Sequence, residues 1–163
     1  MLFAASVIVL FNLAWAQNCN YAAAGVNVNW QTSNGMLTID FSNGVIQNNE
    51  WTAIGFGAKM ANLEVIVFKI VNGVPSVSTG FTKGYGPPTL DSNANVGVQT
   101  LMYNGNTLTA RIVRPLAANG PRNFSLQNCM TWTIVPRGPL TNGNIHKHTT
   151  RPEAIPNVCP AQC

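Results

Sequence analysis

Apolar and polar residues alternate with a period of two along most of this chain, and this alternation is the strongest constraint on its fold. In residues 36–42, Leu37, Ile39 and Phe41 share one side, and the polar Thr38 and Asp40 share the other. Successive side chains of a β-strand point to opposite faces, so the segment is typical of a strand with one buried face. No segment has the 3.6-residue period of a good amphipathic helix.

Seven further segments have strand-like patterns: residues 25–30, 51–57, 64–71, 74–81, 96–103, 107–114 and 130–135. Asn, Gly and Pro separate them. The turns at 104–106 and 72–73 predict tight hairpins, because Asn and Gly tolerate the positive φ that such turns require. About eight strands without helical crossovers predict an antiparallel β-sandwich or barrel.

The first residues have the pattern of a secretory signal. Residues 2–13 are almost wholly apolar, and Ala14-Trp15-Ala16 is a small-x-small cleavage pattern. We therefore expect a signal peptide over residues 1–16 and one domain over residues 17–163, secreted to the extracellular space. No later segment has about 20 consecutive apolar residues, so no membrane span is expected in the mature chain.

The four cysteines, Cys19, Cys129, Cys159 and Cys163, all follow the predicted signal peptide. An even number in an oxidising compartment predicts two disulfides, and three pairings are possible. Bridges that tie the N-terminal segment and the C-terminal tail to the domain near Cys129 are favoured, because long closed loops constrain the unfolded chain most. A bridge between Cys159 and Cys163 is the least useful alternative.

Charge and motifs argue against several classes of function. The basic residues are dispersed at a net charge of +4, without the basic-aromatic runs that bind nucleic acid. The five acidic residues form no obvious carboxylate pair for glycoside chemistry, and neither a GxSxG elbow nor a phosphate-binding loop occurs. A domain that binds a ligand or transfers electrons is favoured over an enzyme. The sequon at Asn123 predicts a glycan on a surface loop.

Met60 and the two histidines, His146 and His148, are the candidate metal ligands. A thioether and an imidazole on one haem iron occupy both axial positions, which suits electron transfer and leaves no site for oxygen. No CxxCH motif occurs, so a haem would be b-type and not covalently attached. Alternatively, Met60 is a core residue and the histidines form a surface site for a divalent metal, although no third ligand is evident.

The order of several landmarks resembles a DOMON domain over most of the mature chain. They are Trp51-x-x-Ile54-Gly55-Phe56 followed by Met60, the strand at 65–68, Pro88 with Asp91, the segment 105–116, and Thr131-Trp132 before a late histidine. The resemblance implies an immunoglobulin-like antiparallel β-sandwich, here of about 8–10 strands with two disulfides. It also implies binding of haem or of sugar.

In b-type cytochrome members, iron lies between a Met after the GF motif and a His near the end, which correspond here to Met60 and His148. Arg151, three residues after His148, also resembles the family pattern. His148 is therefore the favoured ligand, and His146 is the alternative. Phe56 and Trp132, like Trp51 and Phe68, fit core packing as well as a cofactor wall.

The leading hypothesis is a secreted domain that binds haem b and relays single electrons to a separate extracellular redox partner. Lys59, Lys147 and Arg151 flank the proposed ligands and are candidates to neutralise the haem propionates. The competing hypothesis is a redox-inactive extracellular module that binds a carbohydrate or a protein partner.

Overall fold

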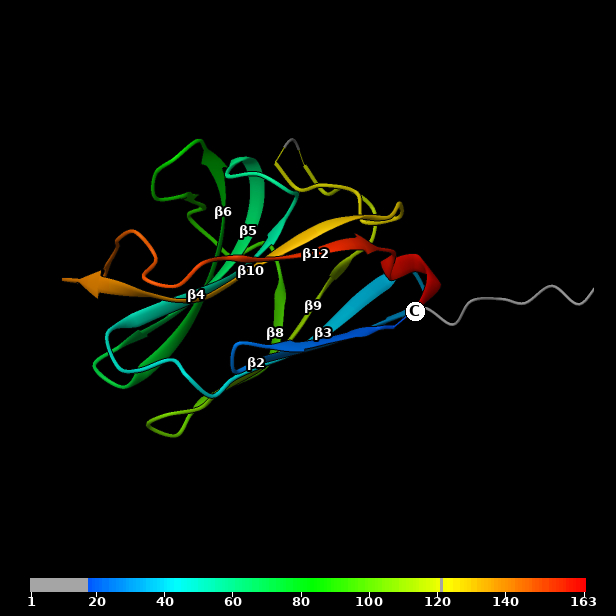
Figure 1. The fold of residues 1–163 in the computed structure, drawn as a ribbon. Coiled ribbons are helices and arrows are strands. Elements are labelled where there is room, and N and C mark those ends of the chain that lie inside the picture. The colour runs from blue at the N-terminus through cyan, green and yellow to red at the C-terminus, as the bar shows by residue number, and fades with distance from the viewer. Residues whose placement is uncertain (1–17, 121) are drawn as a thin grey trace, which may run out of the picture.

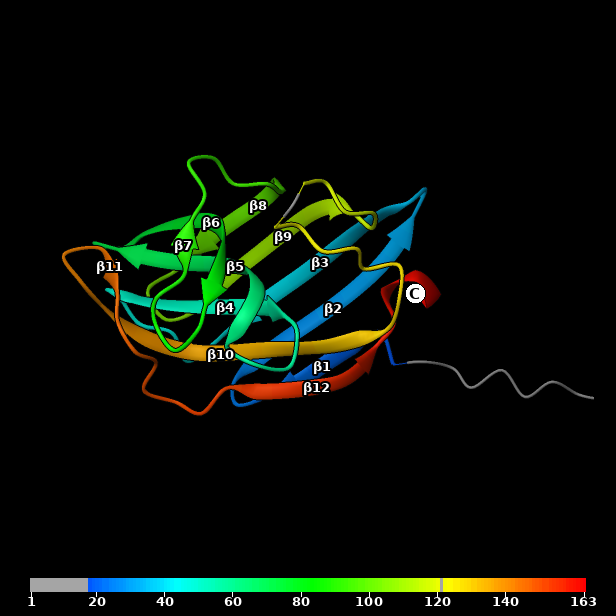
Figure 2. The same cartoon turned by 90° about the horizontal axis from the view of Figure 1, so that it is seen from above.

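The protein is described by a computed structural model that covers residues 18–120 and 122–163. This part of the chain contains twelve β-strands and one short 3₁₀ helix, Pro160–Gln162. The strands form two antiparallel sheets that pack face to face (Figures 1 and 2). The all-β sandwich is therefore confirmed. The predicted signal peptide lies outside the described residues.

The first sheet has five strands in the order β1-β2-β3-β9-β8. Its strands are β1 (Asn20–Ala23), β2 (Val26–Ser33), β3 (Met36–Asn43), β9 (Leu108–Pro115) and β8 (Gly97–Tyr103). The alternation predicted in β3 is present, because Leu37, Ile39 and Phe41 are buried and the intervening side chains are not. This sheet therefore has one apolar inner face and one polar outer face, as is common in antiparallel sheets.

The second sheet has seven strands, with β11-β10-β4-β5-β6-β7 in order and β12 also paired with β10. Its strands are β4 (Glu50–Phe56), β5 (Ala61–Val71), β6 (Val74–Lys83), β7 (Thr89–Leu90), β10 (Met130–Thr141), β11 (Asn144–Ile145) and β12 (Glu153–Val158). From Trp51 onward, every residue of β4 is buried. Both faces of this sheet are therefore covered at its centre.

Aromatic side chains from both sheets fill the core between them. Phe41 of β3 stacks on Phe68 of β5 with ring centroids 4.6 Å apart, and Trp30 of β2 meets Trp132 of β10 at 5.0 Å. Such pairs add about 0.5–1.5 kcal/mol each to the free energy of apolar burial. They tie the two sheets together across the sandwich.

All eight predicted strands are present, and so are both predicted hairpins. In the hairpin between β5 and β6, Asn72 and Gly73 have φ of 52° and 78°, as expected for a tight turn with both central residues left-handed. The sequence did not reveal β1, β7, β11 or β12. Two of these have only two residues, and β12 contains a proline, so their alternation is too short or too irregular to detect.

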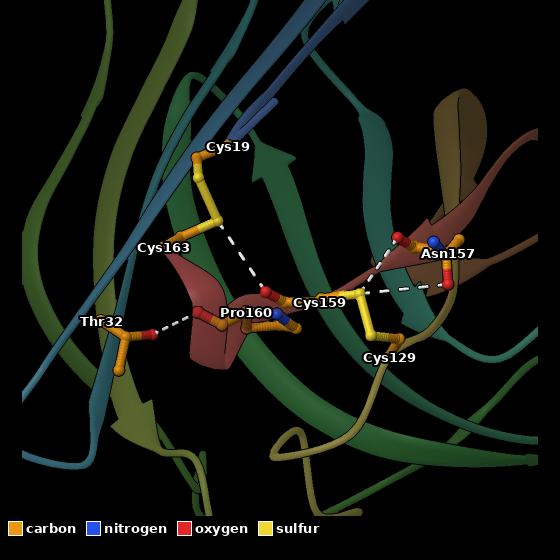
Figure 3. The surroundings of a disulfide bond; sticks show 7 residues. All are labelled: Cys19, Thr32, Cys129, Asn157, Cys159, Pro160 and Cys163. Atoms are coloured by element: carbon orange, nitrogen blue, oxygen red, sulfur yellow. Dashed lines mark hydrogen bonds between the residues drawn. A yellow bond between two sulfur atoms is a disulfide. The ribbon is translucent and has the colours of Figure 1, made fainter. Parts of the chain in front are cut away.

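The two disulfides pair Cys19 with Cys163 and Cys129 with Cys159. Figure 3 shows that they lie on either side of the 3₁₀ helix, whose Pro160 carbonyl accepts a hydrogen bond of 2.8 Å from the Thr32 hydroxyl. The C-terminal tail is tied to Cys129, as favoured, but the N-terminal segment is tied to the tail and not to Cys129. The disfavoured bridge between Cys159 and Cys163 is not formed.

Removing the Cys19–Cys163 disulfide is expected to destabilise the domain more than removing Cys129–Cys159. The first bridge joins residues 144 apart and the second joins residues 30 apart, and a longer loop loses more entropy when it is closed. The chain-entropy model gives losses of about 5 and about 4 kcal/mol respectively. Paired Cys→Ser variants compared by urea unfolding will test this order. Equal losses, or the reverse order, would contradict it.

No helix among the described residues is long and apolar enough to cross a membrane.

Candidate functional site

The outer face of the seven-stranded sheet is apolar, unlike the outer face of the first sheet. Trp51 and Ala53 of β4, Val65 and Val67 of β5, and Val135 of β10 form a second cluster of buried apolar residues on this face. An antiparallel sheet commonly exposes a polar face to water, so an apolar outer face requires another cover.

This face is the floor of a cavity of about 540 Å³. The walls come from three loops: Met60 after β4, residues 85–88 between β6 and β7, and residues 145–148 in and after β11. In Figure 2, the loop that joins β6 to β7 extends over β4. The volume lies within the range of about 300–1,000 Å³ that small-molecule and cofactor sites occupy.

Small residues at the centre of the floor create this hollow. Ala53 and Gly55 are successive outward-facing residues of β4, and both line the cavity. A Cβ atom added to Gly55 would lie only 3.2 Å from the side chain of Leu63, which also lines the cavity. The absence of a side chain at Gly55 therefore leaves room on the cavity side of β4.

The fold brings all three candidate ligands to this one cavity. Met60 and His148 are half-buried, His146 is exposed, and all three line the cavity wall. Met60 comes from the loop before β5, whereas the histidines come from the connection between β11 and β12. Side chains far apart in the sequence thus share one apolar space, and their thioether and imidazole groups are both able to bind a metal.

The imidazole of His148 has a defined tautomer. Its Nδ1 lies 2.8 Å from the backbone oxygen of Thr150, and because a carbonyl oxygen only accepts hydrogen bonds, Nδ1 carries the proton and donates it. In the neutral ring, this arrangement leaves the lone pair on Nε2. Metal-binding histidines are commonly held this way, with one ring nitrogen bonded to a carbonyl and the other free to bind the metal.

Thr150, which orients His148, is itself fixed to a bulge in β10. Its hydroxyl donates to the Arg137 carbonyl at 3.2 Å and accepts from the Arg137 amide at 3.3 Å. The register of β10 against β4 shifts between Val135 and Gly138, next to this contact. The bulge turns Arg137 out of the ladder, so its backbone groups are available to Thr150.

Phe56 and Trp132, predicted to bind the cofactor, do not line the cavity. Both side chains are fully buried between the sheets, with ring centroids 5.2 Å apart. They alternate along their strands with Gly55 and Thr133, which line the cavity, so they point to the opposite face. Of the aromatic residues left undecided by the sequence, Trp51 lines the cavity and Phe68 lies in the core.

A buried ionic network next to the core escaped the sequence reasoning. Arg114 of β9 is 1% exposed and Glu64 of β5 is 2% exposed, and they form an ion pair. Arg114 also donates to the Asn123 side chain at 2.8 Å and to the Phe124 carbonyl at 2.7 Å. The signal for this network in the sequence was Arg114, a charged residue at an apolar position of the predicted strand 107–114. The network joins both sheets to the loop after β9.

Burial dominates the pKa shifts in this network. It raises the pKa of the Glu64 carboxyl, although Arg114 and hydrogen bonds from Phe124 and Asn123 act to lower it. Burial likewise lowers the pKa of the Arg114 guanidinium, against the opposing effect of Glu64. Each charge therefore depends on its partner, because an unpaired charge at this depth is strongly destabilising.

The structure does not support an exposed glycosylation site at Asn123. This side chain is 7% exposed, its Nδ2 donates to Glu64 at 2.8 Å, and its Oδ1 accepts from Arg114 and from the Asn119 amide. The expectation of a surface asparagine is therefore wrong, because the nitrogen that would carry the glycan is inside the network.

We expect the protein, when expressed through a secretory pathway, to carry no glycan at Asn123, since a glycan on Nδ2 would force this side chain out of its buried site. Intact mass spectrometry before and after glycosidase treatment will measure this, with Asn123→Gln as the control. A mass shift that is lost in the variant would contradict the expectation.

Within the described residues, no three side chains of His, Cys, Asp or Glu gather in a way that would hold a metal ion.

The fold and the cavity together define a class: a two-sheet β-sandwich with an apolar ligand cavity on the outer face of one sheet. Residues 23–138 match the family model of the DOMON domain, and the chain belongs to this family. Two DOMON domain-containing proteins of Caenorhabditis elegans are 36% and 34% identical to it. These alignments cover 89% and 95% of this chain, and 81% and 94% of the relatives.

Two solved structures have a similar fold. The cytochrome domain of Myriococcum thermophilum cellobiose dehydrogenase matches 84% of this chain and 76% of its own, with a TM-score of 0.61 and 10% identity. The cytochrome b domain of pyranose dehydrogenase from Coprinopsis cinerea matches 80% and 74%, with a TM-score of 0.58 and 12% identity. At these identities, the likeness establishes the fold alone.

Proposed function

We propose that this protein binds haem b in the cavity on the outer sheet face, with Met60 and His148 as axial ligands, and relays single electrons. The observation that carries the proposal is that a thioether and an imidazole from distant segments line one apolar cavity. Two proteins with the same fold are described as cytochrome domains, which supports it. Bound haem would supply a one-electron iron couple.

His148 is favoured over His146 by its surroundings. The proton on Nδ1 of His148 is held by Thr150, which leaves Nε2 as the free donor atom, and the residue is half-buried. His146 is exposed and contributes its backbone carbonyl to a hydrogen bond from Trp51. A ligand whose tautomer and orientation are fixed in advance loses less entropy when it binds the metal.

The chain's other residues have two roles in this proposal. The apolar floor at Ala53, Val65 and Val135 excludes water, and a Met ligand together with burial favours a high iron potential. Lys147 lines the cavity, and Lys59 and Arg151 are exposed beside the lining residues Met60 and Pro152. We propose that these cations pair with the haem propionates.

We further propose that the protein is secreted and exchanges electrons with a separate extracellular redox partner. The cavity lining, as far as the described residues form it, contains a lysine and no Asp or Glu. A partner with an acidic docking surface fits this charge, so the rate of electron exchange should fall as salt is added.

Titration of the mature protein, residues 17–163, with haemin tests the proposal. We expect stoichiometric uptake and, after reduction by dithionite, the sharp α and β bands of a six-coordinate haem. The variant Ala53→Phe is the control, because it keeps the floor apolar but fills the hollow. No uptake by the wild type, or equal uptake by Ala53→Phe, would contradict binding in this cavity.

A redox-inactive binding module is the second candidate, and Tyr85 is the observation that favours it. This side chain is fully exposed in a loop that lines the cavity. An exposed aromatic ring beside a cavity is able to stack on a sugar. A colourless protein that ignores haemin and binds immobilised polysaccharide through Tyr85 would support this candidate over the first.

A further inference from the structure

We propose that Trp51 and Gly138 form a clamp that fixes the backbone of residues 146–148 and so aims His148 into the cavity. This inference rests on the proposed function only for its consequence at the iron. The clamp itself is a property of the free protein. Trp51 is a positioning residue in this proposal, because it acts on His148 through the backbone.

The first half of the clamp is a hydrogen bond from a buried side chain. The Trp51 indole Nε1 donates to the backbone oxygen of His146 at 3.0 Å, and Trp51 is only 6% exposed. The His146 amide also donates to the Pro139 carbonyl at 3.1 Å. Residue 146 is therefore held through both of its backbone polar groups, two positions before His148.

The second half of the clamp is the missing side chain of Gly138. This residue is paired with Trp51 across β10 and β4. A Cβ atom placed on Gly138 would lie 2.6 Å from Cε2 of Trp51 and 2.9 Å from Cα of His148, far inside van der Waals contact. Its glycine is thus required for space, because the indole and the histidine backbone both pack directly against it.

The clamp complements the contact on the other side of His148. Thr150 holds the imidazole Nδ1 and is anchored to Arg137, whereas Trp51 and Gly138 hold the chain before the histidine. Both anchors begin at the bulge of β10, where the register shifts between Val135 and Gly138. The bulge therefore sets the position of the ligand loop as well as the tautomer of the ring.

Trp51→Phe tests the clamp by removing the N–H and keeping an aromatic ring. In the haem-free protein, we expect amide hydrogen exchange in residues 144–150 to become about three- to tenfold faster, which corresponds to one lost hydrogen bond. Gly138→Ala should have the same effect from the opposite side. In the haemin-loaded protein, both variants should bind haem about 10- to 100-fold more weakly, with a weaker low-spin spectrum and a shifted midpoint potential.

Trp30→Phe is the matched control. It removes another buried indole, whose Nε1 has no hydrogen-bond partner in the described part of the chain and which lies in the core between the sheets. We expect this control to leave exchange in residues 144–150 and the midpoint potential unchanged. If Trp51→Phe and Gly138→Ala match the wild type in exchange, the clamp is refuted. If they speed exchange while the wild type takes up no haem, the clamp stands and the haem proposal fails.

Discussion

Replacing either Met60 or His148 by alanine is expected to abolish the low-spin haem spectrum. Each variant leaves one axial position of the iron without a protein ligand, so the reduced protein should lose its sharp α and β bands. Haem affinity should fall by more than the roughly 10- to 100-fold loss that follows mutation of a residue that only orients a ligand. Haemin titration and spectra of the oxidised and reduced proteins measure both effects.

Two further variants make this test specific. Met60→His keeps the cavity occupied by a ligand, so it should restore a six-coordinate haem with a lower midpoint potential, because a thioether ligand raises the potential. His146→Ala should retain the wild-type spectrum, since the backbone carbonyl that Trp51 contacts is unchanged. If His146→Ala alone destroys the spectrum, the assignment between the two histidines is reversed. If all variants match the wild type, haem binds elsewhere.

Replacing Arg114 by methionine is expected to destabilise the domain by about 3–5 kcal/mol, because it leaves the Glu64 carboxylate buried without its partner. Urea unfolding with the disulfides intact measures this loss. Arg111→Met on the same strand is the matched control. Arg111 forms a two-point ion pair with Asp40 at 2.7 and 2.9 Å, but both side chains are more than 40% exposed, so only a small change is expected.

The pH dependence of the Arg114→Met variant identifies the cause of its instability. Burial raises the pKa of Glu64 in the folded state, and the variant loses Arg114, the largest influence that lowers it. A folded-state pKa above the unfolded value gives stability that is present at low pH and is lost as pH rises through the folded pKa. The deficit relative to the wild type should therefore shrink from pH 8 to pH 5. A deficit that is constant with pH would point to lost packing instead.

The double variant Glu64→Gln with Arg114→Met should recover part of this stability, because no buried charge then remains unpaired. Its coupling energy, obtained from the two single variants, separates the ion pair from the packing of the arginine stem. A double variant less stable than both single variants would contradict this account.

The sequence by itself predicted eight of the twelve described strands, two hairpins, the number of disulfides and the candidate ligands Met60 and His148. Alternation at Leu37, Ile39 and Phe41 is a local property, and the turn at Asn72-Gly73 depends only on which residues tolerate positive φ. The four cysteines after the predicted signal predict two bridges, because an even number of cysteines in an oxidising compartment is expected to pair. Met60 and His148 were recognised through a family resemblance, and both line the cavity. Their role as haem ligands remains a prediction.

Only the tertiary structure decided which face of each strand is which, and what covers it. In β4, Trp51 and Phe56 are both buried, one under the cavity loops and the other between the sheets. Alternation tells which residues share a face, but when both faces are apolar it does not tell which one meets the other sheet. The burial of Asn123 and the partners of Cys19 and Glu64 were hidden for the same reason. Such contacts join segments far apart in the chain, and only the packing of the two sheets brings those segments together.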